Sequence, residues 1–262
     1  MRNRRLGGWA VGGFCAVAVF LLGRNSAAHP AIRLSADIHS EYVKYLSSRD
    51  TITAYLAYPE RRDAAPGVIV IHDIYGLGDR LRPAVERLAR EGFVAIGPDL
   101  LSRRGGTPAS QDSSRKLIFT LNADTLTKDL DATYAYLRTL KAVRADRIGV
   151  IGFCWGGSQS FRYATNNPSL RAFVVCYGTG PDSTALARIK AKGLGVYAEN
   201  DARIDSGLPS LTPQLQRAGV DYHYAIYPGV GHAFLQVTDK PQVADSAWGV
   251  IMRFFRTQLD SR

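Results

Sequence analysis

The sequence predicts an α/β fold in which a mostly parallel, twisted sheet carries helices on both faces and is preceded by an antiparallel hairpin. Short, continuously apolar runs recur along the chain, as expected of parallel strands buried on both faces. Segments with helical spacing of apolar residues lie between these runs, and such alternation is typical of βαβ units. With 262 residues, of which 46% are hydrophobic and 21% charged, the chain can bury one large core.

The first half of the chain predicts the hairpin and the first βαβ unit. Residues 40–58 are rich in β-branched and aromatic side chains, which indicates two antiparallel strands. The apolar runs 67–71 and 93–96 indicate buried strands, with a helix at 81–90 between them. Residues 102–121, rich in Gly, Ser, Thr and Arg, are expected to form a long irregular loop and a candidate lid over a site.

The second half continues the same alternation. Leu126, Leu130, Tyr134 and Leu137 lie at helical spacing and predict a helix over 123–140. The remaining elements, each supported by an apolar run or by helical spacing, are strand 147–151, helix 156–164, strand 172–176, a short helix 183–189, strand 194–198, helix 208–218, strand 222–227 and helix 242–259. No internal repeat or interdomain linker interrupts them, so residues 29–262 are expected to form a single domain.

The first 28 residues predict export. Three arginines precede an apolar run over residues 6–22, and Ser26, Ala27 and Ala28 supply the small side chains wanted at a cleavage site. We therefore expect a signal peptide over residues 1–28 and a periplasmic or secreted protein. The apolar run is also just long enough to span a bilayer, so an uncleaved anchor in the inner membrane is the alternative. The pattern leaves the export route open between the general secretory and twin-arginine pathways.

The charge balance argues against nucleic-acid binding. The formal net charge of +10 includes four arginines of the leader and no leader acid, which leaves +6 for the rest of the chain. This excess is neither gathered into a basic stripe nor part of a recognised nucleic-acid module. A solvated basic surface is the simpler interpretation, and contact with a membrane is expected only if the leader is retained.

Two cysteines remain once Cys15 leaves with the leader. Cys176 lies in the apolar run 172–176, where cysteine is an ordinary buried hydrophobe. Cys154 lies in a different, glycine-rich setting. In an oxidising compartment a disulfide between Cys154 and Cys176 has to be considered.

Cys154 lies in the pattern of a nucleophile elbow. An apolar strand runs into Gly152-Phe153-Cys154-Trp155-Gly156-Gly157 and then into a helical stretch. In such an elbow a sharp strand-to-helix turn strains the nucleophile, and glycines on either side avoid clashes. The helix that follows places N–H groups and partial positive charge near the sulfur. For this motif alone, a glycine-rich turn with a structural cysteine is the alternative interpretation.

Two further residues complete a catalytic triad in the chain order nucleophile, acid, histidine. Asp201 follows the predicted strand 194–198, and His232 lies in a glycine-rich loop after the last strand. Both loops are expected at the carboxyl edge of the sheet, where ligands collect in open α/β folds. We therefore expect His232 to transfer protons, Asp201 to orient the imidazole, and Cys154 to form a thioester that water hydrolyses.

The motifs together resemble the dienelactone hydrolase family of the α/β-hydrolase superfamily, over roughly residue 40 to the C-terminus. The segments that carry this resemblance are His72-Asp73-Ile74-Tyr75-Gly76, Pro98-Asp99-Leu100, Gly152-Phe153-Cys154-Trp155-Gly156-Gly157, Asn200-Asp201 and Gly231-His232-Ala233-Phe234. The resemblance implies hydrolysis of a small-molecule ester or lactone, as by carboxymethylenebutenolidase. It also implies an oxyanion hole formed by the backbone N–H groups of Ile74 and Trp155.

The resemblance also marks where this chain departs from the family. Asp73 stands where the family typically has a glutamate that holds the proton of the cysteine until substrate displaces it. Gln236 stands four residues after the histidine, where the namesake enzyme has an arginine for the substrate carboxylate. Arg103 and Arg115 are the remaining candidates to contact an anionic substrate, with solvated surface arginines as the alternative.

The same sequence features bear on several functions other than lactone hydrolysis. A carboxylesterase or acyltransferase of broad specificity would use the same three residues, whereas a non-catalytic binding protein would be expected to have a broken triad. A thiol redox protein would need a C-x-x-C pair, which the chain lacks. Metal catalysis lacks motifs such as H-E-x-x-H, so we expect no metal and no cofactor.

Overall fold

The computed structural model describes residues 37–260, which form an eight-stranded sheet in the order β1-β2-β4-β3-β5-β6-β7-β8. The predicted leader, residues 1–28, lies outside the described residues. An antiparallel hairpin of β1 (Ile38–Ser47) and β2 (Asp50–Pro59) starts the sheet, and β2 also pairs antiparallel with β4 (Val94–Pro98). The predicted leading hairpin is therefore correct, and it extends one edge of a larger sheet.

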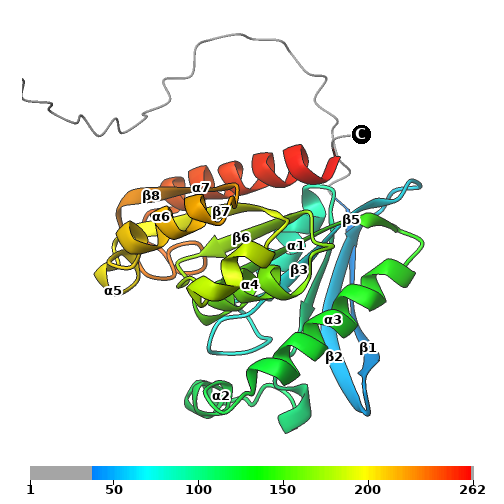
Figure 1. Cartoon of the computed structure of the whole chain (residues 1–262). Coiled ribbons are helices and arrows are strands. Elements are labelled where there is room, and N and C mark those ends of the chain that lie inside the picture. Colours follow the sequence, from blue (N-terminus) through cyan, green and yellow to red (C-terminus); the bar gives the residue numbers. More distant parts are fainter. Residues whose placement is uncertain (1–36, 261–262) are drawn as a thin grey trace, which may run out of the picture. The chain divides into compact units, whose positions relative to one another are not determined.

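The other strands pair in parallel, as their apolar runs predicted. They are β3 (Ala65–Ile71), β5 (Val143–Phe153), β6 (Ala172–Cys176), β7 (Lys192–Asn200) and β8 (Tyr222–Gly231). Every residue of β3, β4 and β6 is buried, because helices cover both faces of the sheet there. Parallel pairing brings the carboxyl ends of these strands to one edge, at the left of Figure 1.

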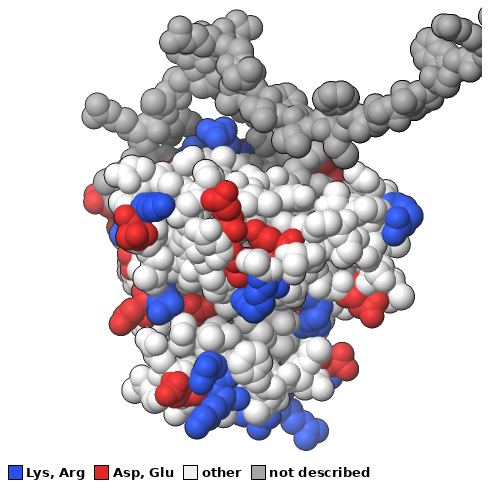
Figure 2. All heavy atoms as spheres, turned by 90° about the vertical axis from the view of Figure 1, so that its left-hand side faces the viewer, with Lys and Arg blue, Asp and Glu red and all other residues white. Residues whose placement is uncertain are grey.

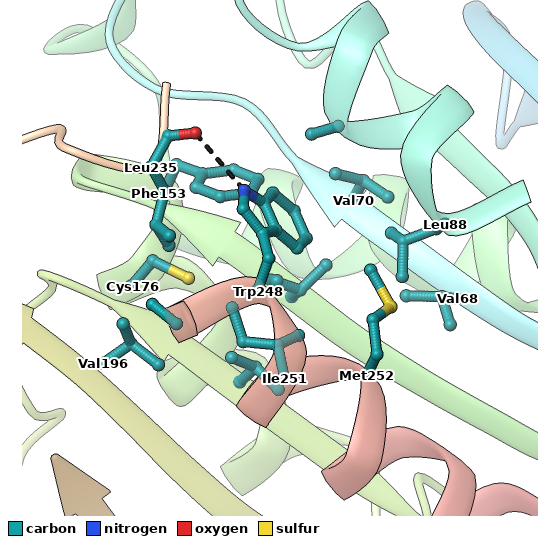
Figure 3. Close-up of a cluster of buried hydrophobic side chains, with 14 of the residues drawn as sticks. Val68, Val70, Leu88, Phe153, Cys176, Val196, Leu235, Trp248, Ile251 and Met252 are labelled. Carbon is teal, nitrogen blue, oxygen red and sulfur yellow. Dashed lines mark hydrogen bonds between the residues drawn. The ribbon is translucent and has the colours of Figure 1, made fainter. Parts of the chain in front are cut away.

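One face of the sheet is covered by α1 (Arg82–Arg90) and α7 (Pro241–Phe255). In this layer Trp248 of α7 donates a hydrogen bond from its indole N–H to the carbonyl oxygen of Leu235, at 3.4 Å. Figure 3 shows this bond beside Ile251 and Met252 of α7 and, across the layer, Leu88 of α1. The amphipathic spacing of both helices thus places their apolar stripes against the sheet.

The opposite face is covered by α3 (Ala123–Thr139), α4 (Trp155–Asn166) and α6 (Leu208–Arg217). Asn122 caps α3: its side-chain oxygen accepts hydrogen bonds from the N–H groups of Asp124 and Thr125. The predicted apolar positions of α3 are all buried. Together the two layers give the α/β-hydrolase architecture that the sequence predicted.

The expectation that residues 102–121 form an irregular loop is wrong. This stretch contains a short 3₁₀ helix (Ser102–Arg104) and the helix α2 (Gln111–Ile118). Only Ser114 and Ile118 of α2 are buried, so the helix lacks the apolar stripe by which sequence periodicity is recognised. The remaining short elements are a 3₁₀ helix (Ser183–Arg188), α5 (Ala202–Asp205) and a π-helical turn (Arg256–Asp260).

No helix among residues 37–260 is long and apolar enough to cross a membrane. Both cysteines of this range are free. The side chain of Cys176 is fully buried beside Val196, Trp248 and Ile251, in the layer between the sheet and α7 (Figure 3).

Candidate active site

Cys154 lies at the junction of β5 and α4 with the backbone of a nucleophile elbow. Its φ of 57° and ψ of −118° are unusual for a residue with a side chain. The turn is tight: a Cβ at Gly152 would lie 1.9 Å from the carbonyl oxygen of Gly156, and a Cβ at Gly156 would lie 2.3 Å from that of His72. Both glycines that the motif singled out are therefore required by backbone packing.

Cys154, His232 and Asp201 form a continuous chain of contacts. The Cys154 Sγ lies 2.9 Å from His232 Nε2, and His232 Nδ1 lies 2.5 Å from Asp201 Oδ2. A thiol that donates to Nε2 and an Nδ1–H that donates to the carboxylate satisfy both ring nitrogens at once. The structure thus brings together all three residues that the sequence placed in different loops.

The sheet explains why these residues meet. Asp201 follows the last residue of β7 and His232 follows the last residue of β8, and the two strands pair up to Asn200 opposite Gly231. The side chain of Asp201 is 5% exposed and that of His232 is 30% exposed. The carboxylate is thus shielded from water, while the imidazole can reach a bound molecule.

The surroundings of Cys154 favour the protonated thiol in the resting site. Burial raises the pKa of the Cys154 thiol, and the negative charges of Asp73 and Asp201 raise it further. The backbone N–H of Trp155, which bonds to the sulfur, and the positive charge of Arg203 act in the opposite direction. The raising influences prevail, so a base is needed to generate the thiolate.

Asp73 is a buried carboxyl group near this sulfur. One of its oxygens accepts a hydrogen bond from the backbone N–H of Tyr75 at 2.8 Å, and the other lies 4.0 Å from the guanidinium of Arg80. Burial raises the pKa of Asp73, whereas the Tyr75 bond and the charges of Arg80 and His232 lower it. Arg80 also stacks over the ring of Tyr75, 4.4 Å from its centroid.

Tyr177 and Gln236 adjoin the histidine, and sequence reasoning gave Tyr177 no role. The Tyr177 ring lies edge-on to His232 with centroids 5.1 Å apart, and its hydroxyl donates to Gln236 Oε1 at 3.3 Å. The Gln236 amide in turn donates to the backbone oxygen of Arg80 at 3.4 Å. Tyr177 follows β6 directly and has a φ of 40°, which is strained for a residue with a side chain. This strain marks the position as unusual in the structure, but a backbone angle cannot be read from the sequence.

Of the two backbone N–H groups predicted to form an oxyanion hole, that of Trp155 contacts the sulfur. Trp155 is the first residue of α4, and its N–H contact with Cys154 is described above. Ile74 lies between Asp73 and Tyr75 in the loop after β3, against which the first turn of α4 packs. His72, the first residue after β3, stacks on the Trp155 ring with the ring centroids 5.7 Å apart. The roles of Ile74 and Trp155 stay predictions.

The two arginines suggested for substrate binding are not among the contacts of the triad. Arg103 binds Asp129 with both Nε and Nη2, at 2.7–3.0 Å, and also pairs with Asp50. Arg115 lies on α2, is 54% exposed and faces Asp112 at 3.7 Å. Arg80 and Arg203, which the sequence did not single out, are the cations that act on the triad and on Asp73.

The carboxyl edge carries mixed charge. Figure 2 views this edge and shows Lys and Arg interspersed with Asp and Glu rather than a field of one sign. Within residues 37–260, no three His, Cys, Asp or Glu side chains are arranged to hold a metal ion. The geometry provides a half-buried thiol, an imidazole in hydrogen-bond contact with it, and a buried carboxylate in contact with that imidazole.

Comparison with known proteins places this chain in a family. The model of the dienelactone hydrolase family matches residues 52–259. A Synechocystis protein whose name assigns it to the carboxymethylenebutenolidases is 29% identical over 86% of this chain and 100% of its own length. A Bradyrhizobium protein is 32% identical over 85% of this chain and 96% of its own length. Its name assigns it as a 2-oxo-3-(5-oxofuran-2-ylidene)propanoate lactonase.

The solved structures agree. A structure from Klebsiella pneumoniae assigned to the dienelactone hydrolases superposes with a TM-score of 0.77 at 27% identity, covering 84% of this chain and 98% of that one. The chain belongs to the dienelactone hydrolase family and is a carboxylic ester hydrolase with the α/β-hydrolase fold.

Proposed function

We propose that the protein opens a lactone or cleaves an ester by nucleophilic catalysis through Cys154, with a thioester intermediate. The observation that carries this proposal is the contact chain from Cys154 Sγ to His232 Nε2 at 2.9 Å and from His232 Nδ1 to Asp201 at 2.5 Å. A nucleophile, a base in hydrogen-bond reach and a group that orients the base are the elements that acyl transfer requires.

The first half of the reaction forms the thioester. Because the pKa of the Cys154 thiol is raised by burial, His232 Nε2 takes its proton as the sulfur attacks the carbonyl carbon. Asp201 stabilises the imidazolium that results. The N–H groups of Trp155 and Ile74 donate hydrogen bonds to the negatively charged oxygen of the tetrahedral intermediate. The C–O bond to the leaving oxygen then breaks, and that oxygen takes the proton from His232.

The second half releases the product. Water gives a proton to His232 Nε2 and attacks the thioester carbonyl, so that the C–S bond breaks and the Cys154 thiol is restored with the proton from His232. With a lactone the leaving oxygen stays attached to the acyl chain, and one ring-opened hydroxy or oxo acid is the product. With an ester the alcohol leaves before water attacks.

The substrate is proposed to be a small anionic lactone or ester, like the lactone for which the Bradyrhizobium relative is named. Arg103 is committed to Asp129 in the folded chain, which leaves Arg80, one-third exposed beside Asp73, as the cation for a substrate carboxylate. Gln236 supports this choice because it fixes the backbone of Arg80. A broad-specificity carboxylesterase or acyltransferase that uses the same triad is the alternative.

We also propose that the protein acts outside the cytoplasm, in the periplasm or as a secreted enzyme, on the strength of residues 1–28. If the leader is retained, it would anchor the enzyme to the inner membrane. Fractionation of cells that produce the full chain, followed by N-terminal sequencing of the mature form, tests both statements. Recovery of the full-length protein in the cytoplasm would refute export.

The catalytic proposal is tested by hydrolysis of p-nitrophenyl acetate and of dienelactone under reducing conditions. The wild-type protein should turn over at least one of them, and Cys154→Ala and His232→Ala should each lose that activity. Mass spectrometry of Cys154 in an acid-quenched reaction should detect the acyl group on the sulfur. Retention of the wild-type rate by Cys154→Ala would refute the nucleophile, and preference for p-nitrophenyl acetate would favour the broad esterase.

A further inference from the structure

A hollow of about 710 Å³ lies at the amino edge of the parallel strands, opposite the edge that carries Cys154. Its walls come from the end of α3, the starts of β5 and β7, the segment between α4 and β6, and the C-terminal turn. Five cationic side chains line it, and they are Arg138, Arg147, Arg171, Lys190 and Lys192. Its volume is typical of small-molecule sites.

The parallel sheet gathers these cations. Lys192 pairs in register with Ala172, and its N–H donates to the carbonyl oxygen of Arg171 at 3.1 Å. Arg171 Nε in turn donates to the carbonyl oxygen of Asp146 at 3.1 Å, next to Arg147. Residues in or just before the first turns of three neighbouring strands, β5, β6 and β7, are thereby held side by side, and their basic side chains line one space.

Carboxylates compensate this charge only in part. Arg147 pairs with Asp146 at 3.2 Å and Lys192 with Asp221 at 2.5 Å. In the part of the chain that the structure describes, no ion pair joins Arg138, Arg171 or Lys190 to a carboxylate. Asp146 is the single acidic residue in the lining. The hollow therefore holds a clear excess of positive charge.

Neutralisation of helix ends does not account for this cluster. Basic residues in the last turn of a helix interact favourably with its dipole, and this explains Arg138 at the end of α3. Arg147 and Lys192 lie on strands, and Arg171 and Lys190 lie just before strands. Like charges held close together oppose folding, so a concave arrangement of this kind indicates a counter-charge that binds there.

We propose that this hollow is a binding site for a phosphate-bearing anion. Clustered Arg and Lys recognise phosphate, with arginine supplying paired N–H donors and lysine a point charge. Ser169 and Gln258 in the lining add neutral hydrogen-bonding groups. The same chemistry is offered by a free phosphate compound and by the headgroup of an anionic phospholipid. Because the site lies at the opposite edge from the triad, it is separate from the proposed catalysis.

The test compares the full-length wild-type chain with two double variants. Arg138→Gln/Lys190→Gln removes two cations from the hollow. Arg49→Gln/Lys116→Gln removes the same charge from exposed positions outside the hollow and is the matched control. All three proteins keep the same N-terminal residues, so differences between them arise at the substituted positions. The probes are inorganic pyrophosphate, by calorimetry, and phosphatidylcholine vesicles with or without 30% phosphatidylglycerol, by co-sedimentation.

Wild type and the matched control should bind a phosphate probe equally, and the hollow variant should bind it about 30-fold more weakly, with hydrolase activity unchanged in all three. Binding of pyrophosphate identifies a soluble ligand, and binding only of the phosphatidylglycerol vesicles identifies a lipid headgroup. Either result supports the site. Equal weakening in both variants, or no binding of either probe by the wild type at 0.15 M salt, would overturn it.

Discussion

Replacement of Asp201 by asparagine isolates the role of the carboxylate, since it keeps the side-chain shape and removes the charge. In the wild type, Asp201 Oδ2 lies 2.5 Å from His232 Nδ1 in a site where the carboxylate is 5% exposed. A buried, charge-assisted hydrogen bond to an imidazolium is worth about 2–4 kcal/mol. At about 1.36 kcal/mol per tenfold change in rate, Asp201→Asn should lower kcat about 30- to 1,000-fold.

The assay is steady-state hydrolysis of p-nitrophenyl acetate, with thermal unfolding to verify that the variant is folded. Asp205→Asn is the matched control, because Asp205 lies one helical turn further on in α5 and does not contact His232. Its kcat should stay within about threefold of the wild type, as expected when no hydrogen bond to the reacting groups is lost. If Asp201→Asn retained more than a tenth of the wild-type kcat, the assignment of Asp201 as the orienting acid would be refuted.

Three further substitutions test neighbouring parts of the structure. Asp73→Asn removes a negative charge that raises the pKa of Cys154, so the pH midpoint of iodoacetamide alkylation should move downward; an unchanged midpoint would contradict this coupling. Gly152→Ala should destabilise the protein in urea by at least about 3 kcal/mol because its Cβ meets backbone, whereas Gly249→Ala, with open space around it, should be neutral or stabilising. Arg103→Gln leaves the buried carboxylate of Asp129 without its partner and should lower the free energy of unfolding by about 2–4 kcal/mol, with KM unchanged. A raised KM in a variant of wild-type stability would instead indicate that Arg103 contacts the substrate.

The sequence predicted the sheet well because its signals are local. A strand buried on both faces has to be apolar throughout, and the sequences of β3 and β6 are continuous runs of apolar and small residues. The elbow could be found for the same reason, since its glycines lie within a few residues of Cys154 in the sequence, although the backbone that excludes a side chain is local for Gly152 and is that of Ile71 and His72 for Gly156. Asp201 and His232 followed from the rule that parallel strands end at one edge.

What the sequence did not predict depends on contacts between distant residues. The partner of Arg103 is Asp129, 26 residues away on α3, and no local pattern distinguishes this arginine from one that binds substrate. The helix α2 was missed because tertiary contacts of Ser114 and Ile118, rather than an apolar stripe, hold it. Tyr177 was missed because only the folded sheet brings it against His232.

The electrostatics of the site connect the proposed chemistry to the proposed compartment. The thiolate is the form of cysteine that oxidants attack, and burial together with Asp73 and Asp201 raises the pKa of Cys154. Cys176, the other cysteine of the described chain, is buried in the layer beneath α7 and pairs with Cys154 only through backbone, its carbonyl oxygen accepting the Cys154 N–H at 3.0 Å. In the proposed mechanism the thiol stays protonated until His232 takes its proton during attack, and this would limit oxidation of Cys154 in the proposed extracytoplasmic compartment. The same arrangement keeps its reactivity for a bound acyl group.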